Sequence, residues 1–236
     1  MMNLLIFKEE MQKIGIELND DQMLQFGDYL HLLQKASQRM NLTAIKDEAG
    51  IIEKHFYDSL LLAKYLPFDE QTTMLDIGTG AGFPGIPLKI AFPHLKVTLL
   101  EPVLKKARFL ARVINELKLR DIIVVVERAE TYAYREYEQF DLVTARAVAP
   151  LNILLELGVP LAKVEGLVVA YKGPKAEEEI KEAENALQIL GCHLEDVFVE
   201  RLPSDHDHRS LVVIKKDIPT PSQFPRKYAL IKKQPL

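Results

Sequence analysis

Residues 74–85 read Met-Leu-Asp-Ile-Gly-Thr-Gly-Ala-Gly-Phe-Pro-Gly, and this stretch decides the fold class of the chain. An apolar run that contains Asp76 leads into four glycines within eight positions, and residues 86–92 then have the apolar spacing of a helix. Glycine accepts positive φ angles and has no Cβ to block a ligand. The stretch therefore predicts a strand, a tight turn that binds a nucleotide-like ligand, and the start of a helix.

From residue 72 the chain alternates between strand-like and helix-like patterns. Strands are predicted at 73–77, 96–101, 122–126, 140–145 and 166–171. Helices are predicted between them, at about 84–92, 103–117, 150–162 and 175–190. This alternation predicts an α/β protein with a doubly wound, Rossmann-like parallel sheet. Two later β-like runs, 193–201 and 209–216, predict an antiparallel hairpin that closes one edge of the sheet.

Two further segments flank this region. Residues 3–66 have helical apolar spacing and no strand pattern, with Asn19 and Asp47 as candidate helix caps. The last residues hold four prolines among basic side chains, which predicts an extended tail. We therefore expect a helical N-terminal extension at 1–66, the α/β domain at 67–218 and a basic C-terminal tail at 219–236.

The composition is that of a globular protein, with 48% apolar and 27% charged residues. The first residues lack the pattern of a secretory signal, and no apolar run approaches the ~18 residues of a membrane span. The single cysteine, Cys192, excludes an internal disulfide framework and fits a reducing compartment. We therefore expect a cytoplasmic protein with no membrane attachment. No metal site is predicted, because no cysteine or acidic residue completes a convincing ligand set with His206 and His208.

Charge is distributed unevenly along the chain, although the net charge is only −4. Residues 209–236 carry seven Lys or Arg side chains against one Asp, and a second basic cluster lies at 105–120. Each cluster is either a solvated surface or a contact for a polyanion such as nucleic acid.

Two cofactor classes fit the glycine loop, a dinucleotide and S-adenosylmethionine. Residues 80–85 match Gly-x-Gly-x-x-Gly literally, so the loop alone leaves an NAD-linked oxidoreductase as an alternative. Either cofactor needs a carboxylate after the next strand to bind ribose hydroxyls, and Glu101 lies nineteen residues after Gly82. The other interpretation of Glu101 is an acidic residue that stabilises a helix N-terminus.

Three features favour the methyl donor. Asp76 precedes the first glycine by two residues, where its carboxylate can hold the loop and meet the amino group of a methionine moiety, whereas a pyrophosphate would be repelled. Residues 128–130, Arg-Ala-Glu, follow the third strand, where a methyl-donor site reads an adenine edge. A terminal hairpin is typical of the seven-stranded methyltransferase sheet. We therefore predict an S-adenosylmethionine site that uses Asp76, Gly78, Gly80, Gly82 and Glu101.

The acceptor is predicted from devices that the sequence lacks. No Pro-Pro-aromatic motif for amine methylation follows the fourth strand, which leads into Arg146-Ala-Val-Ala-Pro150. Carbon-5 methylation of pyrimidines needs a cysteine nucleophile, but Cys192 starts the hairpin and is interpreted as a small core residue. An acceptor that is nucleophilic without help, such as guanine N7, fits this sequence, because its methylation needs only proximity and orientation.

Arg146 and Lys172 are the candidate catalytic residues. Arg146 lies at the ligand edge of the sheet, where a guanidinium can bind a carboxylate, a phosphate or a guanine edge. The alternative for Arg146 is a structural ion pair with an acid such as Asp141. Lys172 ends the fifth strand and faces the same crevice by topology. His55 and Asp58, three residues apart, are predicted to be a hydrogen-bonded pair that serves helix packing.

The extended motif Leu75-Asp-Ile-Gly-Thr-Gly-Ala-Gly-Phe-Pro-Gly-Ile-Pro-Leu88 is far more specific than a glycine fingerprint, and with it the chain resembles the RsmG (GidB) methyltransferases. The resemblance runs from about residue 20 to Arg226 and includes Asn41-Leu-Thr43, His55-x-x-Asp58-Ser-Leu60, Arg128-Ala-Glu130, Arg146-Ala147 and Lys172-Gly173. It implies a bacterial enzyme that uses S-adenosylmethionine to methylate guanine N7 in the 530 loop of 16S ribosomal RNA.

The resemblance also implies site residues and partners. The donor-binding positions of the family fall on Gly78, Phe83, Ala129, Glu130 and Arg146. Many relatives have Asp-Ser where this chain has Glu101-Pro102, and the longer carboxylate can still bind a ribose diol. The implied partner is 16S rRNA, in the small ribosomal subunit or an assembly intermediate, with the basic tail on the RNA. We expect a monomer, and a non-catalytic RNA-binding module of methyltransferase fold is a further alternative.

Overall fold

The computed structural model describes residues 1–203 and 208–236 of the chain. Its strands are β1 (Thr73–Ile77), β2 (Lys96–Leu100), β3 (Ile122–Val125), β4 (Phe140–Arg146), β5 (Ala162–Lys172), β6 (Cys192–Arg201) and β7 (His208–Lys216). They form one seven-stranded sheet in the order β3-β2-β1-β4-β5-β7-β6. The pairs among β1 to β5 are parallel, and β7 runs antiparallel to both β5 and β6. These strands confirm the predicted α/β, Rossmann-like seven-stranded sheet and its terminal hairpin.

The predicted helical N-terminal extension is also confirmed. Its elements are α1 (Leu4–Lys13), α2 (Asp20–Ser37), α3 (Glu48–Ile51), the π-helical η1 (Ile52–Tyr57), α4 (Asp58–Leu60) and the 3₁₀-helical η2 (Leu61–Lys64). Asn19 and Gln22 form a reciprocal cap for α2, in which each side chain accepts a hydrogen bond from the other residue's backbone N–H at 2.9 Å. Asp47 caps α3 by accepting a bond of 2.7 Å from Gly50 N.

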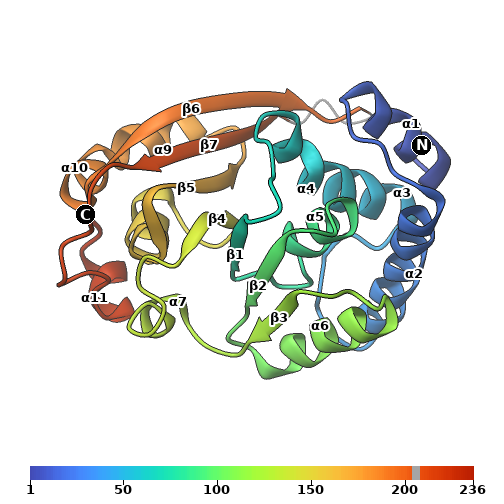
Figure 1. The fold of residues 1–236 in the computed structure, drawn as a ribbon, viewed down its shortest axis with the longest axis horizontal. Coiled ribbons are helices and arrows are strands. Elements are labelled where there is room, and N and C mark those ends of the chain that lie inside the picture. The colour runs from blue at the N-terminus through green and yellow to red at the C-terminus, as the bar shows by residue number, and fades with distance from the viewer. Residues whose placement is uncertain (204–207) are drawn as a thin grey trace.

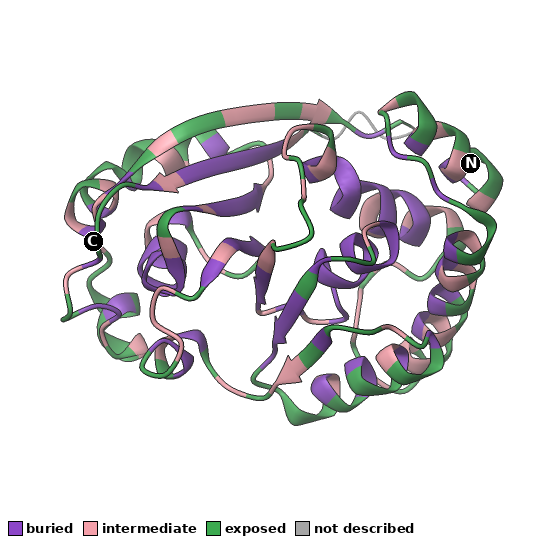
Figure 2. Ribbon diagram, in the orientation of Figure 1, coloured by how far each residue is buried: buried purple, intermediate pink, exposed green. Residues whose placement is uncertain are grey.

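The other helices cover the sheet on both faces. They are α5 (Gly85–Ala91), α6 (Leu104–Glu116), α7 (Ala129–Tyr132), α8 (Leu151–Gly158), η3 (Val159–Leu161), α9 (Ala176–Glu182), α10 (Glu184–Leu190) and α11 (Tyr228–Lys233). Neighbours on β4, Leu142 and Val143, belong to different hydrophobic clusters, because successive side chains of a strand point to opposite faces. One cluster joins the sheet to α1, α2, α5 and α6, and the other joins it to α7, α8, α10 and α11. Figure 1 shows these two groups on opposite sides of the molecule, and Figure 2 shows the buried residues concentrated on the central strands and the inner sides of the helices.

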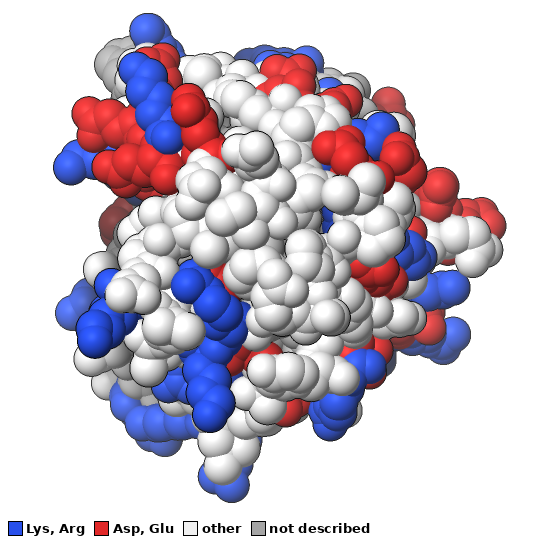
Figure 3. Space-filling model, turned by 90° about the vertical axis from the view of Figure 1, so that its left-hand side faces the viewer, with Lys and Arg blue, Asp and Glu red and all other residues white. Residues whose placement is uncertain are grey.

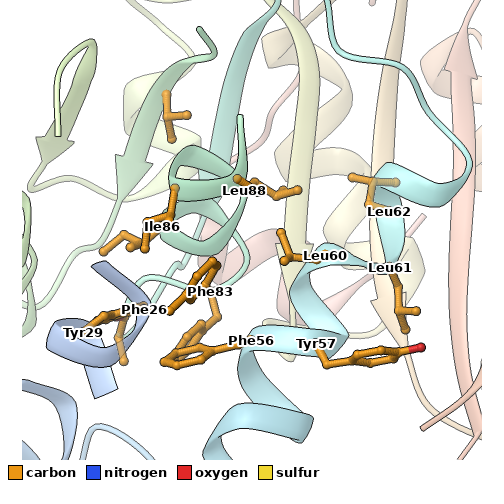
Figure 4. Packing of buried hydrophobic residues seen from close by; sticks show 14 of the residues in the cluster. Phe26, Tyr29, Phe56, Tyr57, Leu60, Leu61, Leu62, Phe83, Ile86 and Leu88 are labelled. Carbon is orange, nitrogen blue, oxygen red and sulfur yellow. The ribbon is translucent and has the colours of Figure 1, made fainter. Parts of the chain in front are cut away.

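Aromatic side chains connect the N-terminal extension to the glycine loop (Figure 4). Tyr29 of α2 stacks on Phe56 of η1, with ring centroids 5.3 Å apart, and lies 5.5 Å from the ring of Phe83 in the loop. The Tyr29 hydroxyl donates a hydrogen bond of 2.6 Å to the carbonyl of Ala81. The extension therefore shares the core of the sheet and holds the loop from one side.

The C-terminal residues differ from the prediction of an extended tail, which is wrong for residues 228–233. These residues form α11, and its Ile231 side chain is fully buried. Arg226 binds the buried carboxylate of Glu156, with Nε and Oε1 2.7 Å apart. Lys216, another member of the basic cluster, is buried and donates to two backbone carbonyls at 2.9 and 3.0 Å. These two cations serve the fold and are not a free surface for a polyanion.

The surface charge is uneven. On the face that carries α10 and α11, most acidic side chains lie in the upper part, mixed with some Lys and Arg, whereas Lys and Arg predominate in the lower part (Figure 3). Within residues 1–203 and 208–236, no helix is both long enough and apolar enough to cross a membrane.

Candidate functional site

The glycine loop joins the carboxyl end of β1 to the start of α5. Gly78, Gly80 and Gly82 have φ angles of +61°, +63° and +110°, in the region that favours glycine. A Cβ on Gly82 would lie only 2.5 Å from Ile86 Cδ1, whereas a Cβ on Gly80 would have its nearest neighbour, Gly78 O, 3.9 Å away. The space beside Gly80 is therefore open, as a cradle for a ligand requires.

Asp76 holds this loop in place. Its Oδ2 accepts hydrogen bonds from Thr79 Oγ1 at 2.6 Å and from Gly85 N at 2.9 Å. The side chain is completely buried, and this burial raises the pKa of Asp76 to about 6 despite the hydrogen bonds that lower it. The loop-holding part of the sequence interpretation is present in the structure, and the contact between Asp76 and the donor amino group stays a prediction.

Asp76→Asn is expected to stabilise the fold above pH 6. Because the pKa of this carboxyl is higher in the folded than in the unfolded chain, the wild-type free energy of unfolding falls as pH rises from about 4 to about 6. A shift of about two pKa units corresponds to about 3 kcal/mol. Asparagine can accept the same bond from Gly85 N without this loss.

Chemical unfolding of both proteins between pH 4 and 8 measures this effect. The difference in the free energy of unfolding should grow in favour of Asp76→Asn up to pH 6 and then level off. Other titrating groups act on both proteins and cancel in the difference. A difference that stays constant across the range would contradict the burial argument.

A first hollow, of about 110 Å³, lies beside the glycine loop. It brings Gly78 together with Ala129 and Glu130 at the start of α7, and Pro102 and Val148 also line it. The residues predicted to bind the adenine therefore line the same hollow as the loop. We call this hollow the donor pocket.

Glu101 lies next to the donor pocket and is buried. Its carboxylate accepts hydrogen bonds from Gly80 N at 3.0 Å and from Val103 N at 2.8 Å. The second bond lies just before α6, so the contact expected of a helix-terminal acid is present. An ionised carboxylate has about four acceptor sites, so the same side chain keeps capacity for the hydroxyls of a ribose.

A second hollow, of about 330 Å³, lies between the N-terminal extension and the sheet. Its charged lining residues are Lys54, Asp58, Arg146, Lys172 and Arg209. We call it the acceptor cleft. Residues 146–148 adjoin both hollows, because Arg146 and Ala147 line the acceptor cleft and Val148 lines the donor pocket. Ala147 has a φ of +56°, a costly conformation for alanine that the surrounding structure must enforce.

The Arg146 guanidinium is fixed by contacts on several sides. Its Nη1 donates to Asp58 Oδ2 at 2.9 Å and to the carbonyl of Lys54 at 3.2 Å, and its Nη2 lies 3.2 Å from His55 Nδ1. The guanidinium carbon lies 4.9 Å from the centre of the Phe83 ring. These contacts with described residues use three of the five N–H groups of arginine. The other two N–H groups of Arg146 donate no hydrogen bond to the residues that the structure describes, and the role of Arg146 in positioning an acceptor stays a prediction.

His55 orients this guanidinium as a neutral imidazole. Burial and the nearby charge of Arg146 lower the pKa of His55 to about 3. Because its Nδ1 accepts from Arg146, its Nε2–H donates to Thr43 Oγ1, 2.6 Å away. The imidazole also stacks on Phe83, with ring centroids 4.5 Å apart. Phe83 is itself buried under these groups, and its predicted contact with the donor stays a prediction.

These contacts correct two sequence interpretations. The ion pair considered as the alternative for Arg146 is present, but its partner is Asp58, 2.9 Å away. Asp141 instead binds Thr73 Oγ1 and Lys163 Nζ, both at 2.6 Å. The predicted hydrogen bond between His55 and Asp58 is wrong, because His55 binds Thr43 and Arg146, and Asp58 binds Arg146 at the end of β4. Their spacing of three places them on one helix face. Which element that face meets is set by tertiary packing, so the sequence pattern gave no signal for it.

Lys172 lines the acceptor cleft, as topology predicted, but its ammonium is already bound. It donates to the carbonyl of Ala149 and to Glu179 Oε2, both at 2.7 Å. Its catalytic role stays a prediction. Cys192 is buried, and burial raises the pKa of its thiol to about 12, as fits a core residue.

Residues 1–203 and 208–236 contain no group of three or more His, Cys, Asp or Glu side chains placed to hold a metal ion. His208 is the first residue of β7. His206, the other histidine considered for a metal site, lies outside the described residues.

Comparison with known proteins gives consistent matches. The family model of rRNA small subunit methyltransferase G (GidB) matches residues 22–210. The ribosomal RNA small subunit methyltransferase G of Geobacillus thermodenitrificans is 42% identical over 232 residues, and that of Halalkalibacterium halodurans is 44% identical over 232 residues; both alignments cover 98% of each chain. Among solved structures, TYW2 of M. jannaschii in complex with AdoMet has a TM-score of 0.57 at 17% identity, covering 75% of this chain and 81% of that chain.

The structural likeness identifies the fold, and the sequence matches identify the family. The structural likeness confirms the fold, a seven-stranded methyltransferase sheet with helices on both faces. The matching residues include the glycine loop, the Arg146 segment and most of the N-terminal extension. The chain therefore belongs to the rRNA small subunit methyltransferase G (GidB) family.

Proposed function

We propose that this chain transfers a methyl group from S-adenosylmethionine to N7 of a guanine in the 530 loop of 16S ribosomal RNA. The observation that carries the proposal is that one short segment, residues 146–148, lines both the donor pocket and the acceptor cleft. Methyl transfer needs a donor and an acceptor on either side of one short gap. The names of the relatives, which refer to small-subunit ribosomal RNA, support an rRNA substrate.

The donor fits the residues around the first hollow. The open space at Gly80 accepts a group that a side chain would exclude. Glu101 would hold the ribose hydroxyls, Ala129 and Glu130 would bound the adenine, and Gly78 would let the ligand approach the backbone. Asp76 would act indirectly, because its hydrogen bonds to Thr79 and Gly85 keep the loop in its positive-φ conformation. The donor supplies a methyl group made electrophilic by a positively charged sulfur.

Methylation of guanine N7 makes few chemical demands on the protein. The N7 lone pair forms a bond to the methyl carbon while the sulfur–carbon bond breaks, so the positive charge passes to the base and no proton leaves. The reaction therefore needs no general base. The acceptor cleft is consistent with that, because its His55 is neutral and hydrogen-bonded and its Asp58 is paired with Arg146. Arg146 would position the base through its two remaining N–H groups.

The acceptor cleft also has the charge that a nucleic acid requires. Arg146, Lys172 and Arg209 line it with the carboxylate of Asp58, and Glu179 binds Lys172 from its edge. Three cations thus face two carboxylates, so positive charge is in excess. A cationic hollow favours phosphate groups near the site. The partner would be 16S rRNA in the small ribosomal subunit or in an assembly intermediate, and the enzyme would work as a cytoplasmic monomer.

The test is methyl transfer by the purified chain. Incubation with 16S rRNA and methyl-labelled S-adenosylmethionine should place the label in the RNA. RNA binding without transfer would instead support a non-catalytic module. Calorimetric binding of NADH without binding of S-adenosylhomocysteine would support the oxidoreductase alternative.

A further inference from the structure

A third hollow lies away from the two already described, between α2 and α6. Its volume is about 450 Å³, and its charged lining residues are Lys35 and Arg39 of the α2 end and Lys105, Arg108 and Arg112 of α6. All five side chains belong to exposed residues. We call this hollow the α2–α6 groove. No carboxylate lines it, although the chain as a whole is acidic.

The cations of the groove are almost free of ion pairs. Among the described residues, the only carboxylate contact of the five is that of Arg112 Nε with Glu116 Oε1, at 3.7 Å. Lys105 Nζ instead approaches the carbonyl of Arg39 at 3.4 Å. Five cations around one hollow repel each other, and an anionic ligand would remove that cost.

The floor of the groove is apolar. Leu32, Ala36 and Met40 come from the α2 side, and Phe109 comes from α6. An unpaired base can pack its flat face on such an apolar floor, while the arginines bind phosphate or stack on the base. A protein interface of the same size is typically depleted of charge at its centre. The combination therefore favours a single-stranded nucleic acid over a protein segment.

The chain itself connects the groove to the acceptor cleft. Met40 lines the groove, and Ile45, five residues further on, lines the acceptor cleft. The hydroxyl of Thr43, between them, lies 2.6 Å from His55 Nε2, and the same imidazole contacts Arg146. Five residues span at most about 18 Å, so an RNA strand that leaves the acceptor cleft beside Ile45 can reach the groove at Met40.

We propose that the α2–α6 groove binds an unpaired segment of the RNA substrate next to the methylated nucleotide. This inference rests on the proposed function, since it assumes that RNA is the acceptor. The groove would add affinity and register without touching the reacting atoms. RNA binding in the groove would also give a function to the basic cluster at 105–120, which is not part of the catalytic site.

The test compares Arg108→Ala/Arg112→Ala with wild type. Both side chains are exposed, so the fold should be retained. We expect the Kd for a 16S rRNA transcript to rise about tenfold, and the slope of log Kd against log salt to fall by about 1.4, because each phosphate contact on a single strand contributes about 0.7. The Kd for S-adenosylhomocysteine and kcat at saturating RNA should not change.

Lys96→Ala/Lys181→Ala is the matched control. It removes the same charge from two exposed residues that line neither the groove nor the two hollows of the site. Lys96 begins β2, at the end of that strand opposite to Glu101, and Lys181 lies in α9, on the other side of the molecule from α2 and α6 (Figure 1). This variant should keep the wild-type Kd and salt slope. An equal loss in both double variants would overturn the inference, because it would show a general charge effect.

Two other results would overturn the groove inference. One is an unchanged Kd and salt slope in Arg108→Ala/Arg112→Ala while methyl transfer by wild type is normal. The other is weaker binding to the small ribosomal subunit with normal binding to the transcript, which would assign the groove to a protein partner. Failure of the proposed function looks different, because wild type would then transfer no methyl group to rRNA.

Discussion

Arg146→Ala is expected to lower kcat/KM for methyl transfer by about 10²–10³-fold, the usual cost of losing one preorganised donor group in an active site. The guanidinium is held by Asp58, His55 and the carbonyl of Lys54, so it can position an acceptor without further ordering. Alanine leaves the gap between the donor pocket and the acceptor cleft without this group. Single-turnover methyl transfer to 16S rRNA measures the loss.

In Arg146→Ala, a loss of stability must be distinguished from a loss of methyl-transfer activity. Removing Arg146 leaves the buried carboxylate of Asp58 with Arg209, 3.3 Å away, as its remaining ion-pair partner among the described residues, and breaking a buried pair costs about 3–5 kcal/mol. Arg146→Met/Asp58→Asn removes both charges and should recover most of that stability. It should remain as inactive as Arg146→Ala. Wild-type activity in the double variant would mean that the guanidinium has only a structural role.

Glu101→Ala is expected to weaken binding of S-adenosylhomocysteine by about 10–100-fold. The carboxylate accepts from Gly80 N and Val103 N, and it would also accept from the ribose. A hydrogen bond to a charged group contributes about 1.5–3 kcal/mol, so loss of the ribose contact together with a looser loop gives an effect of this size. Isothermal calorimetry measures it directly.

Glu101→Gln provides the graded control. Glutamine keeps one acceptor oxygen and replaces the other by an NH₂ group, so it can satisfy one of the two backbone N–H groups. Its affinity for S-adenosylhomocysteine should lie between those of wild type and Glu101→Ala. Unchanged affinity in both variants would show that Glu101 serves only the start of α6.

Much of the fold could be predicted from the sequence because its signals are local. The seven strands were expected from apolar runs and the loop from its glycines, and the structure has them at nearly the same residues. The start of β5 shows the limit. The strand begins at Ala162, four residues before the predicted start at 166. The prediction missed these residues because they include polar side chains and Glu165, whose φ of +66° interrupts the extended backbone.

The candidate site could be predicted only where the ligand-facing residue follows a strand. Arg146, Glu101 and Ala129 qualify, since parallel strands end at one edge of the sheet. His55 and Asp58 do not, because their place beside Arg146 depends on how the N-terminal extension packs on the sheet. The charge of Lys216 was counted as surface for the same reason, since only the folded chain shows that it is buried.

Mapping of the modified nucleotide tests the central claim most directly. The purified chain, S-adenosylmethionine and unmodified small ribosomal subunits or 16S rRNA would be incubated, and the nuclease fragments of the RNA analysed by mass spectrometry with N7-specific cleavage. The proposed function predicts one N7-methylguanine, in the 530 loop, and its absence with Arg146→Met/Asp58→Asn. Methylation at an exocyclic amine or a pyrimidine, or no methylation of 16S rRNA at all, would contradict it.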